Sequence, residues 1–297
     1  MLDYPAAHAV FLVVQTGSFD SAAKALGVTP SAVSQRVRGL EERLGVILVE
    51  RGTPCVPTDE GAWLCRHIEH VGLLEGQLVD RFPQMQVQRA ATPVTLHIAT
   101  NADSLGTWFL PALAAFTKET GFLLDIAVDD EEHTADWLRR GRVTAAVTAL
   151  SKPVQGCRIK TLGRLRYHAT ASPDYIDRHF SSGVTGEALA AAPALTFNQK
   201  DRLQQQWVKC AVGQPIAFPT HWLPSSQGFV EAAMAGMGWG LNPIHLVRDH
   251  LASGRLVELV PGSTLDVTLF WQTSHLAAPH IATLTRAVMN HAKKALS

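Results

Sequence analysis

The feature that most limits the fold of this chain lies in residues 19–38, which read FDSAAKALGVTPSAVSQRVR. Two helices that nearly touch need a small residue at their contact, and Ala23 supplies one. Four positions later the turn needs a residue that tolerates a positive φ, and Gly27 supplies that. Val33, six positions further on, can pin the second helix onto the first. This spacing predicts a helix-turn-helix.

The second helix of the pair has a marked start and two different faces. Thr29 is a favourable N-cap, and Pro30 is favoured at the first helical position. One apolar stripe runs from Val33 to Leu44, and the opposite face carries hydroxyl, amide and guanidinium groups. Such groups suit base edges and phosphates of double-stranded DNA, although a polar face on an isolated helix is often only solvated. The predicted DNA-contacting residues are Thr29, Pro30, Ser31, Ser34, Gln35, Arg36, Arg38 and, from the next turn, Arg51.

Residues 46–61, VILVERGTPCVPTDEG, have the outline of a β-wing that completes a winged helix-turn-helix over residues 1–58. The first 60 residues hold five basic and seven acidic side chains, and the whole chain has a formal net charge of zero. This balance argues against a general polyanion binder. Affinity for DNA would therefore depend on a few arginines, repeated by oligomerisation.

A long helix is predicted to follow, over residues 59–82, after the capping start at Thr58. A helix between two globular parts has little of its own domain to cover an apolar stripe, so we expect pairing with a second copy. The alternative is packing on its own DNA-binding domain, at least in the first turns. With the polar hinge at 84–93, this segment forms a linker and dimerisation region over 59–92. The stripe consists of Leu64, Ile68, Val71, Leu74, Leu78 and Phe82.

Beyond residue 93 the sequence alternates between strand and helix patterns, which predicts an α/β domain with a parallel sheet and right-handed crossovers. A two-lobed small-molecule-binding domain is one natural form of this pattern. We expect it over 93–297, with lobe I at about 93–164 and 268–297 and lobe II at about 165–267. The predicted strands are 94–100, 122–128 and 144–150, and the predicted helices are 101–121, 131–141 and 276–295.

Ligands in such sheets bind beyond the carboxyl ends of strands and at helix N-termini. Backbone amides near Ser104 suit a carboxylate, and the acidic run at 129–132 suits an amine or a guanidinium. Each polar residue taken alone could equally be a helix cap or a solvated turn. The candidate pocket residues are Asn101, Asp103, Ser104, Asp129, Asp130, Glu131 and Thr148 after the first three strands, and Asn198, Ser225, Ser226 and Gln227 in the second lobe.

Several kinds of site are not expected. The segment GMGWGLNP (236–243) follows a predicted helix and precedes a strand, which is the reverse of a dinucleotide-binding context. Neither the 13 histidines nor the four cysteines have the spacing of metal ligands, and no nucleophile elbow is found. We therefore expect no enzyme, no metal and no cofactor. Without a signal sequence or an apolar run that could cross a membrane, we expect a cytoplasmic protein.

The whole chain resembles the LysR-type transcriptional regulators and, within them, the ArgP (IciA)/LysG branch. The segments that carry the resemblance are SAVSQRV (31–37), NADSLGTWFLPAL (101–113), LRRGRVTAAVT (138–148), GMGWGLNP (236–243) and FWQ (270–272). The second of these adds Trp108 to the effector-binding candidates. The resemblance implies a periplasmic-binding-protein-like effector domain that senses a basic amino acid, lysine or arginine, and controls genes of amino-acid transport or metabolism. It also implies a dimer or tetramer that contacts operator DNA and RNA polymerase.

One residue departs from the branch. Where the resembling proteins usually have Glu after the serine pair of the second lobe, this chain has Gln227. If that Glu pairs with a ligand cation, its loss weakens recognition of a basic amino acid. The alternative function is a nucleoid-type or replication-origin-type DNA-binding protein whose C-terminal lobes mainly oligomerise.

Overall fold

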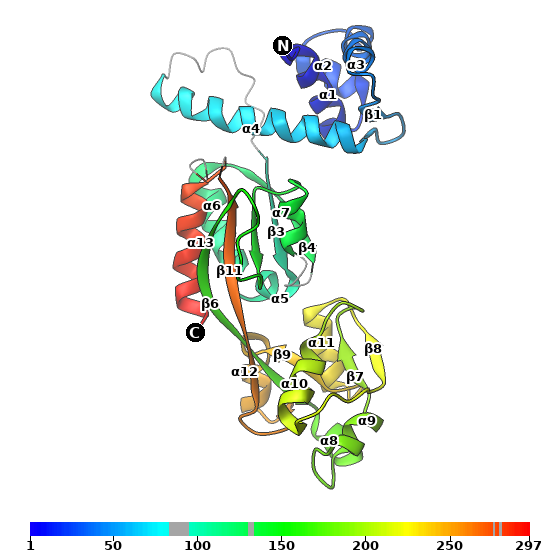
Figure 1. Ribbon diagram of the computed structural model, residues 1–297, viewed down its shortest axis with the longest axis vertical. Helices are drawn as coiled ribbons and strands as arrows, with labels where there is room; N and C mark the ends of the chain where they lie inside the picture. The colour runs from blue at the N-terminus through cyan, green and yellow to red at the C-terminus, as the bar shows by residue number, and fades with distance from the viewer. Residues whose placement is uncertain (83–94, 130–133, 276, 279–280) are drawn as a thin grey trace. The chain divides into compact units, whose positions relative to one another are not determined.

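The computed structural model describes residues 1–82, 95–129, 134–275, 277–278 and 281–297 (Figure 1). These residues form two compact units, Met1–Thr95 and Leu96–Ser297. The predicted hinge at 84–93 lies outside the described residues, as do Asp130 and Glu131. No helix in the described ranges is long and apolar enough to cross a membrane.

The N-terminal unit is a winged helix-turn-helix with a long fourth helix. Its core joins side chains from every helix, among them Val10, Ala23, Val33 and Ile68, each less than 9% exposed. Ala23 and Val33 are thus buried in the same core, in agreement with the spacing. The elements are α1 (Tyr4–Thr16), α2 (Phe19–Leu26), α3 (Pro30–Leu44), β1 (Val49–Glu50), β2 (Val56–Pro57) and α4 (Asp59–Arg81).

Local signals define the limits of these helices. The Ser18 hydroxyl accepts from the Ser21 amide at the start of α2, and the Thr29 hydroxyl accepts from the Ala32 amide at the start of α3. Gly27 has φ 64°, the left-handed conformation that closes α2. The predicted caps and turn residue are therefore confirmed.

The wing is attached to the end of α3 and to the start of α4. The Glu41 carboxylate accepts from the backbone amides of Leu48 and Val49, at 2.8 and 3.3 Å. Gly61, in the first turn of α4, lies so close to the wing that a Cβ there would be 1.8 Å from the Leu48 carbonyl oxygen. The wing and the beginning of α4 therefore pack as one piece.

The apolar stripe of α4 divides into two parts. Cys65 and Ile68 are buried in the N-terminal core and Leu64 packs against it. Farther along, Leu74 and Phe82 are 53% and 50% exposed. Packing on its own domain thus covers the first turns of α4, and Leu74 and Phe82 beyond them are exposed, while the side chain of Leu78 lies outside the described residues.

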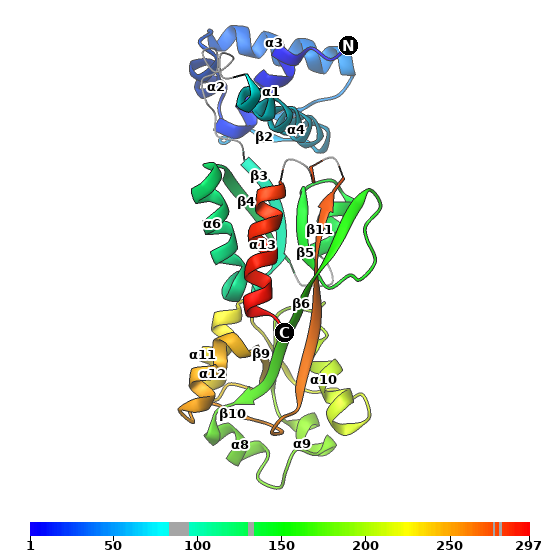
Figure 2. The same ribbon diagram turned by 90° about the vertical axis from the view of Figure 1, so that its left-hand side faces the viewer.

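The C-terminal unit has two lobes that share two long strands (Figure 2). Lobe I contains β3, β4 and β5 with their helices and the last helix, α13, and β3 and β5 pair in parallel as predicted. The predicted helix 101–121 is formed by α5, a π-helical turn η2 and α6 in succession. The elements are β3 (Thr95–Asn101), α5 (Ala102–Ser104), η2 (Leu105–Phe109), α6 (Leu110–Thr120), β4 (Leu123–Asp129), α7 (Thr134–Arg139), β5 (Ala145–Thr148) and α13 (Ala282–Ala295).

Lobe II differs from the predicted continuation of strand and helix. Residues 157–171 form one long strand, β6, which runs antiparallel to β11 through both lobes, with a register shift at Leu269/Phe270. The expected lobe boundary at 164/165 lies within β6. Around these strands lie α8 (Pro173–His179), α9 (Gly186–Ala191), β7 (Ala194–Thr196), α10 (Leu203–Val212), β8 (Thr220–Trp222), α11 (Ser226–Met234), β9 (Gly240–Pro243), α12 (Ile244–Ala252), β10 (Val257–Glu258) and β11 (Thr264–Ser274).

Candidate functional site

The polar face of α3 is open to solvent. Of the predicted DNA-contacting residues only Ser34 is partly buried, and Thr29, Pro30, Ser31, Gln35, Arg36, Arg38 and Arg51 are exposed. Val33, Val37 and Leu40 are at most 2% exposed on the opposite side. The helix therefore presents a side-chain row suited to hydrogen bonding while its apolar stripe holds it on the domain.

Two of these arginines have partners within the domain. The Arg38 Nε donates to the Glu42 carboxylate at 2.8 Å, and the Arg51 guanidinium lies 5.0 Å from the centre of the Phe19 ring. Both contacts are at the surface, where an ion pair or a cation–π contact contributes about 1 kcal/mol or less. Phosphate groups can replace them at small cost.

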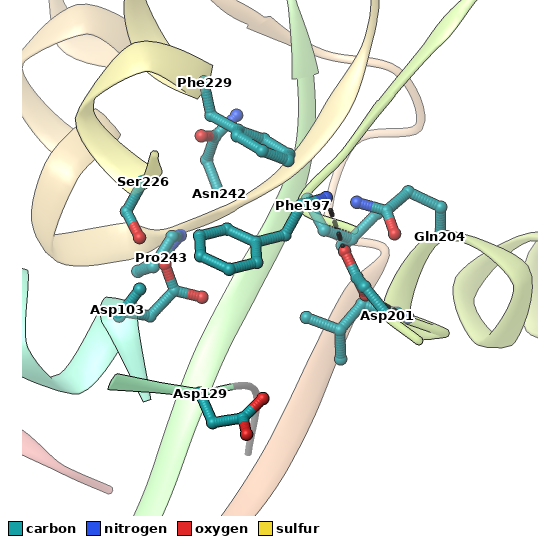
Figure 3. Close-up of a pocket in the computed structure, with 12 residues that line it drawn as sticks. Asp103, Asp129, Phe197, Asp201, Gln204, Ser226, Phe229, Asn242 and Pro243 are labelled. Carbon is teal, nitrogen blue, oxygen red and sulfur yellow. Dashed lines mark hydrogen bonds between the residues drawn. The ribbon is translucent and has the colours of Figure 1, made fainter. Parts of the chain in front are cut away.

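A cavity lies between the two lobes of the C-terminal unit and holds about 440 Å³ of empty space, its open mouth included. Lobe I contributes Asp103 and Asp129, and lobe II contributes residues from the ends of β7, α10, α11 and β9 (Figure 3). The lining residues are Ala102, Asp103, Asp129, Phe197, Asp201, Leu203, Gln204, Ser226, Phe229, Leu241, Asn242 and Pro243.

Asp103 is a partly buried acidic side chain of the cavity. Burial raises the pKa of its carboxyl, an effect that the neighbouring hydroxyls of Ser226 and Tyr167 oppose and that Asp201 adds to. The Tyr167 hydroxyl, on the shared strand β6, donates to Asp103 at 2.8 Å. The Ser226 hydroxyl points toward Asp103 in Figure 3 but forms no hydrogen bond of ordinary geometry within the described structure. Asp103 is therefore placed to bind a donor from a ligand.

The loop after β7 is held in a fixed shape by two side chains. The Asn198 carboxamide oxygen accepts from the amides of Lys200 and Asp201, and the Asp201 carboxylate accepts from the amides of Phe197 and Leu203. Asn198, a predicted site residue, thus shapes the loop without lining the cavity. Asp201, which was not predicted, is 9% exposed and does line it.

Two amide side chains bring hydrogen-bond acceptors to the cavity. The Gln204 Oε1 and Asn242 Oδ1 atoms are buried and have no hydrogen-bond partner among the described residues. Unpaired buried acceptors are costly, and a ligand with several N–H groups would satisfy them. The cavity is thus rich in acceptors, since three carboxylates also line it.

Asp129, at the end of β4, connects the two lobes. Its carboxylate accepts from the Trp137 indole N–H at 3.3 Å in lobe I, and its other oxygen lies 3.8 Å from the Lys200 ammonium of lobe II. The side chain of Asp129 is 25% exposed and that of Lys200 is 54% exposed. This ion pair sits where the loop after β7 meets lobe I.

The remaining predicted residues lie around the cavity without lining it. Asn101, Ser104, Trp108 and Thr148 are buried, and polar atoms of the first three lack partners in the described chain. Ser225 caps α11 through the Gly228 amide. Gln227 is exposed on the first turn of α11 and does not line this cavity, so its part in effector binding stays a prediction.

Sequence reasoning missed most of the lobe II lining. The missed residues are Ala102 of lobe I and, from lobe II, Phe197, Asp201, Leu203, Gln204, Phe229, Leu241, Asn242 and Pro243. Asn242 and Pro243 belong to the segment GMGWGLNP, which is excluded as a nucleotide loop by its context and forms part of the family resemblance. A polar Asn inside a buried strand pattern was the available signal.

Two protein families match the chain along almost its whole length. Residues 7–62 match "Bacterial regulatory helix-turn-helix protein, lysR family", and residues 92–293 match "LysR substrate binding domain". These ranges contain the exposed polar face of α3 and every residue that lines the cavity.

Individual relatives agree with this assignment. The transcriptional regulator ArgP of Pseudomonas aeruginosa (strain UCBPP-PA14) is 42% identical over 292 residues, which cover 98% of this chain and 96% of that protein. The transcriptional regulator LysG of Mycobacterium bovis is 42% identical over 287 residues, covering 97% and 92%.

Solved structures agree as well. ArgP from Mycobacterium tuberculosis has 40% identity and a TM-score of 0.78, covering 100% of this chain and 99% of that one. Full-length LysG from Corynebacterium glutamicum, solved with the bound effector Arg, has 34% identity and a TM-score of 0.67, covering 99% of each chain. The C-terminal domains of a LysR family protein from Agrobacterium tumefaciens are 62% identical, with a TM-score of 0.67, and cover 68% of this chain and 98% of that one. The chain belongs to the LysR family of bacterial helix-turn-helix regulators.

Proposed function

We propose that the cavity of the Leu96–Ser297 unit binds a basic amino acid, arginine or lysine, and that binding changes how the helix-turn-helix unit acts on operator DNA. One observation carries the proposal: three aspartates and two unpaired amide oxygens line the cavity, and none of its described lining residues is cationic. Such a site favours a ligand with a positive charge and several N–H donors.

The carboxylate of an amino-acid ligand can bind at the start of α11. Ser226 lines the cavity in the first turn of the nine-residue helix α11. The partial positive charge of a helix start favours a carboxylate there. An amino acid with its carboxylate at α11 and its side-chain cation near Asp129 would use both ends of the cavity. Gln227, which stands where the resembling proteins usually have Glu, is exposed, and the three aspartates that line the cavity are present without it.

A ligand-binding experiment tests the proposal directly. Thermal unfolding of the full-length protein is followed with arginine, lysine, citrulline and norleucine. Arginine or lysine at about 100 times its Kd adds about 2.7 kcal/mol to the free energy of unfolding. Citrulline has nearly the shape of arginine, and norleucine nearly that of lysine, but neither has a cationic side chain. We expect both to leave the melting curve unchanged. Equal stabilisation by charged and neutral ligands, or none by either cation, contradicts the proposal.

The proposal extends to partners and place of action. The exposed apolar side chains of Leu74 on α4 and Phe82 just after it, each about half exposed, support pairing with a second copy into a dimer and then a tetramer. We further propose that the protein acts in the cytoplasm, where it contacts RNA polymerase and regulates genes of amino-acid transport or metabolism. A gel shift with the DNA upstream of its own gene, with and without arginine, tests this part.

A further inference from the structure

The ion pair between Lys200 and Asp129 places in the protein the same kind of cation that the proposed ligand carries. Asp129 is one of the three carboxylates that line the cavity, and Lys200 is not a lining residue. The Lys200 ammonium nevertheless approaches Asp129 to 3.8 Å from the other lobe. A primary ammonium on a four-carbon chain is the same group that free lysine carries.

The backbone that carries Lys200 is held by hydrogen bonds, whereas its side chain is about half exposed to solvent. Its amide donates to the Asn198 carboxamide oxygen at 2.7 Å, and the next residue, Asp201, is tied to the amides of Phe197 and Leu203. The side chain is 54% exposed, so water can solvate the ammonium if it leaves Asp129. An exposed pair of this kind is weak, contributing less than a desolvated contact with a bound ligand would.

We propose that Lys200 is a built-in competitor for the cation of the ligand. In the ligand-free protein it neutralises Asp129 and joins lobe II to lobe I. A ligand cation that reaches Asp129 displaces the ammonium into solvent. Lys200 thereby lowers the affinity of the cleft for every cationic ligand and sets the concentration at which the regulator responds. This inference rests on the proposed function.

The opposite role for Lys200 makes a different prediction. If its ammonium bound the carboxylate of an amino-acid ligand, removing it would weaken amino-acid binding. Its position beside a carboxylate of the cavity favours competition instead, because a bound carboxylate there would face Asp129 at close range. Agmatine, which is arginine without its carboxylate, separates the two roles.

The main experiment is calorimetric titration of full-length Lys200→Met with arginine, lysine and agmatine. Competition predicts that all cations among these that bind the wild type bind the variant about fivefold more tightly. Lys200→Arg keeps a competing charge and stays close to the wild type. The matched control is Lys209→Met, which removes an exposed lysine from α10 of the same lobe and leaves all affinities unchanged. Unchanged affinity in Lys200→Met overturns the inference, as does weaker amino-acid binding with unchanged agmatine binding.

A second measurement needs no ligand. Melting temperatures of the wild type, Asp129→Asn, Lys200→Met and the double variant form a double-mutant cycle. If the pair joins the lobes, the melting temperature of the double variant falls by less than the sum of the decreases in the two single variants. Additive losses overturn the joining role. Should the wild type bind none of the three ligands, the proposed function fails, and this cycle still decides whether Lys200 and Asp129 interact.

Discussion

The two compact units of this regulator are built in different ways. In the Met1–Thr95 unit, helices that follow one another pack directly together, and short segments supply the caps, the turn and the recognition face. The cavity of the Leu96–Ser297 unit is instead assembled from five separate stretches between residues 102 and 243. A DNA-reading surface can thus be altered by one local change, whereas the cleft depends on how distant segments come together.

This difference affects what each unit tolerates. The recognition face of α3 is solvent-exposed, so its residues can change without disturbing the core beneath. The cleft carboxylates are partly or wholly buried and hold neighbouring structure, as Asp201 does for the loop after β7. We expect substitutions in the cleft to change both ligand binding and local structure. Substitutions on the exposed face of α3 should change DNA binding and leave the structure of the domain intact.

We expect the largest loss of stability from a substitution at Gly61, where α4 lies directly against the wing. Gly61→Ala places a Cβ 1.8 Å from the Leu48 carbonyl oxygen and 2.8 Å from its carbonyl carbon, so the wing and α4 must separate. We expect a loss of about 3 kcal/mol in the free energy of unfolding of this unit, measured by chemical denaturation. Gly39→Ala, in the middle of α3 with nothing within 4 Å of the new Cβ, is the control and is expected to stabilise by about 0.5–1 kcal/mol. A stable Gly61→Ala would show that the wing is not packed as described.

A smaller effect is expected on the recognition face. Gln35→Ala and Arg38→Ala each remove an exposed side chain that has no part in the core. We expect each to lose about 1–3 kcal/mol of operator binding, measured by fluorescence anisotropy, because one base or phosphate contact is lost. The free energy of unfolding stays within about 0.5 kcal/mol of the wild-type value, since the Arg38–Glu42 pair lies at the surface. Normal operator affinity with both changes combined would move the reading surface away from α3.

The smallest effect concerns pH at the cleft. Burial raises the pKa of Asp103, so the free protein takes up a proton there at a higher pH than an exposed aspartate does. A bound cation favours the ionised carboxylate, and binding therefore releases a proton when the pH is near that pKa. Arginine affinity should then fall as the pH is lowered through this range, by about tenfold per pH unit at most. Titration calorimetry at several pH values measures this slope.

Asp103→Asn provides the control for that slope. The variant keeps the shape of the side chain and its contact with the Tyr167 hydroxyl but cannot titrate. We expect weaker arginine binding that hardly changes with pH over the same range. A wild-type slope that persists in Asp103→Asn would assign the titration to another group.

The sequence allowed most of the first unit to be predicted and only part of the second. Thr29, Pro30 and Gly27 act through their immediate neighbours, so spacing alone identified them. Asp103 and Asp129 were also identified, because they follow strands of a regular alternation. Asp201 and Gln204 were not, since their places in the cavity depend on how lobe II meets lobe I. The long strand β6 had no turn signal of its own to mark the passage from one lobe to the other.

The two strands shared by the lobes have a mechanical consequence. β6 and β11 remain paired from His168 and Thr264 in lobe II to Cys157 and Ser274 in lobe I, interrupted by one register shift. A change in the angle between the lobes must therefore be absorbed as torsion of this ribbon rather than as free rotation of a flexible tether. We expect this torsion to concentrate where the regular pairing is interrupted, near Gly163 and the shift at Leu269/Phe270, so that these positions act as the hinge of the ribbon.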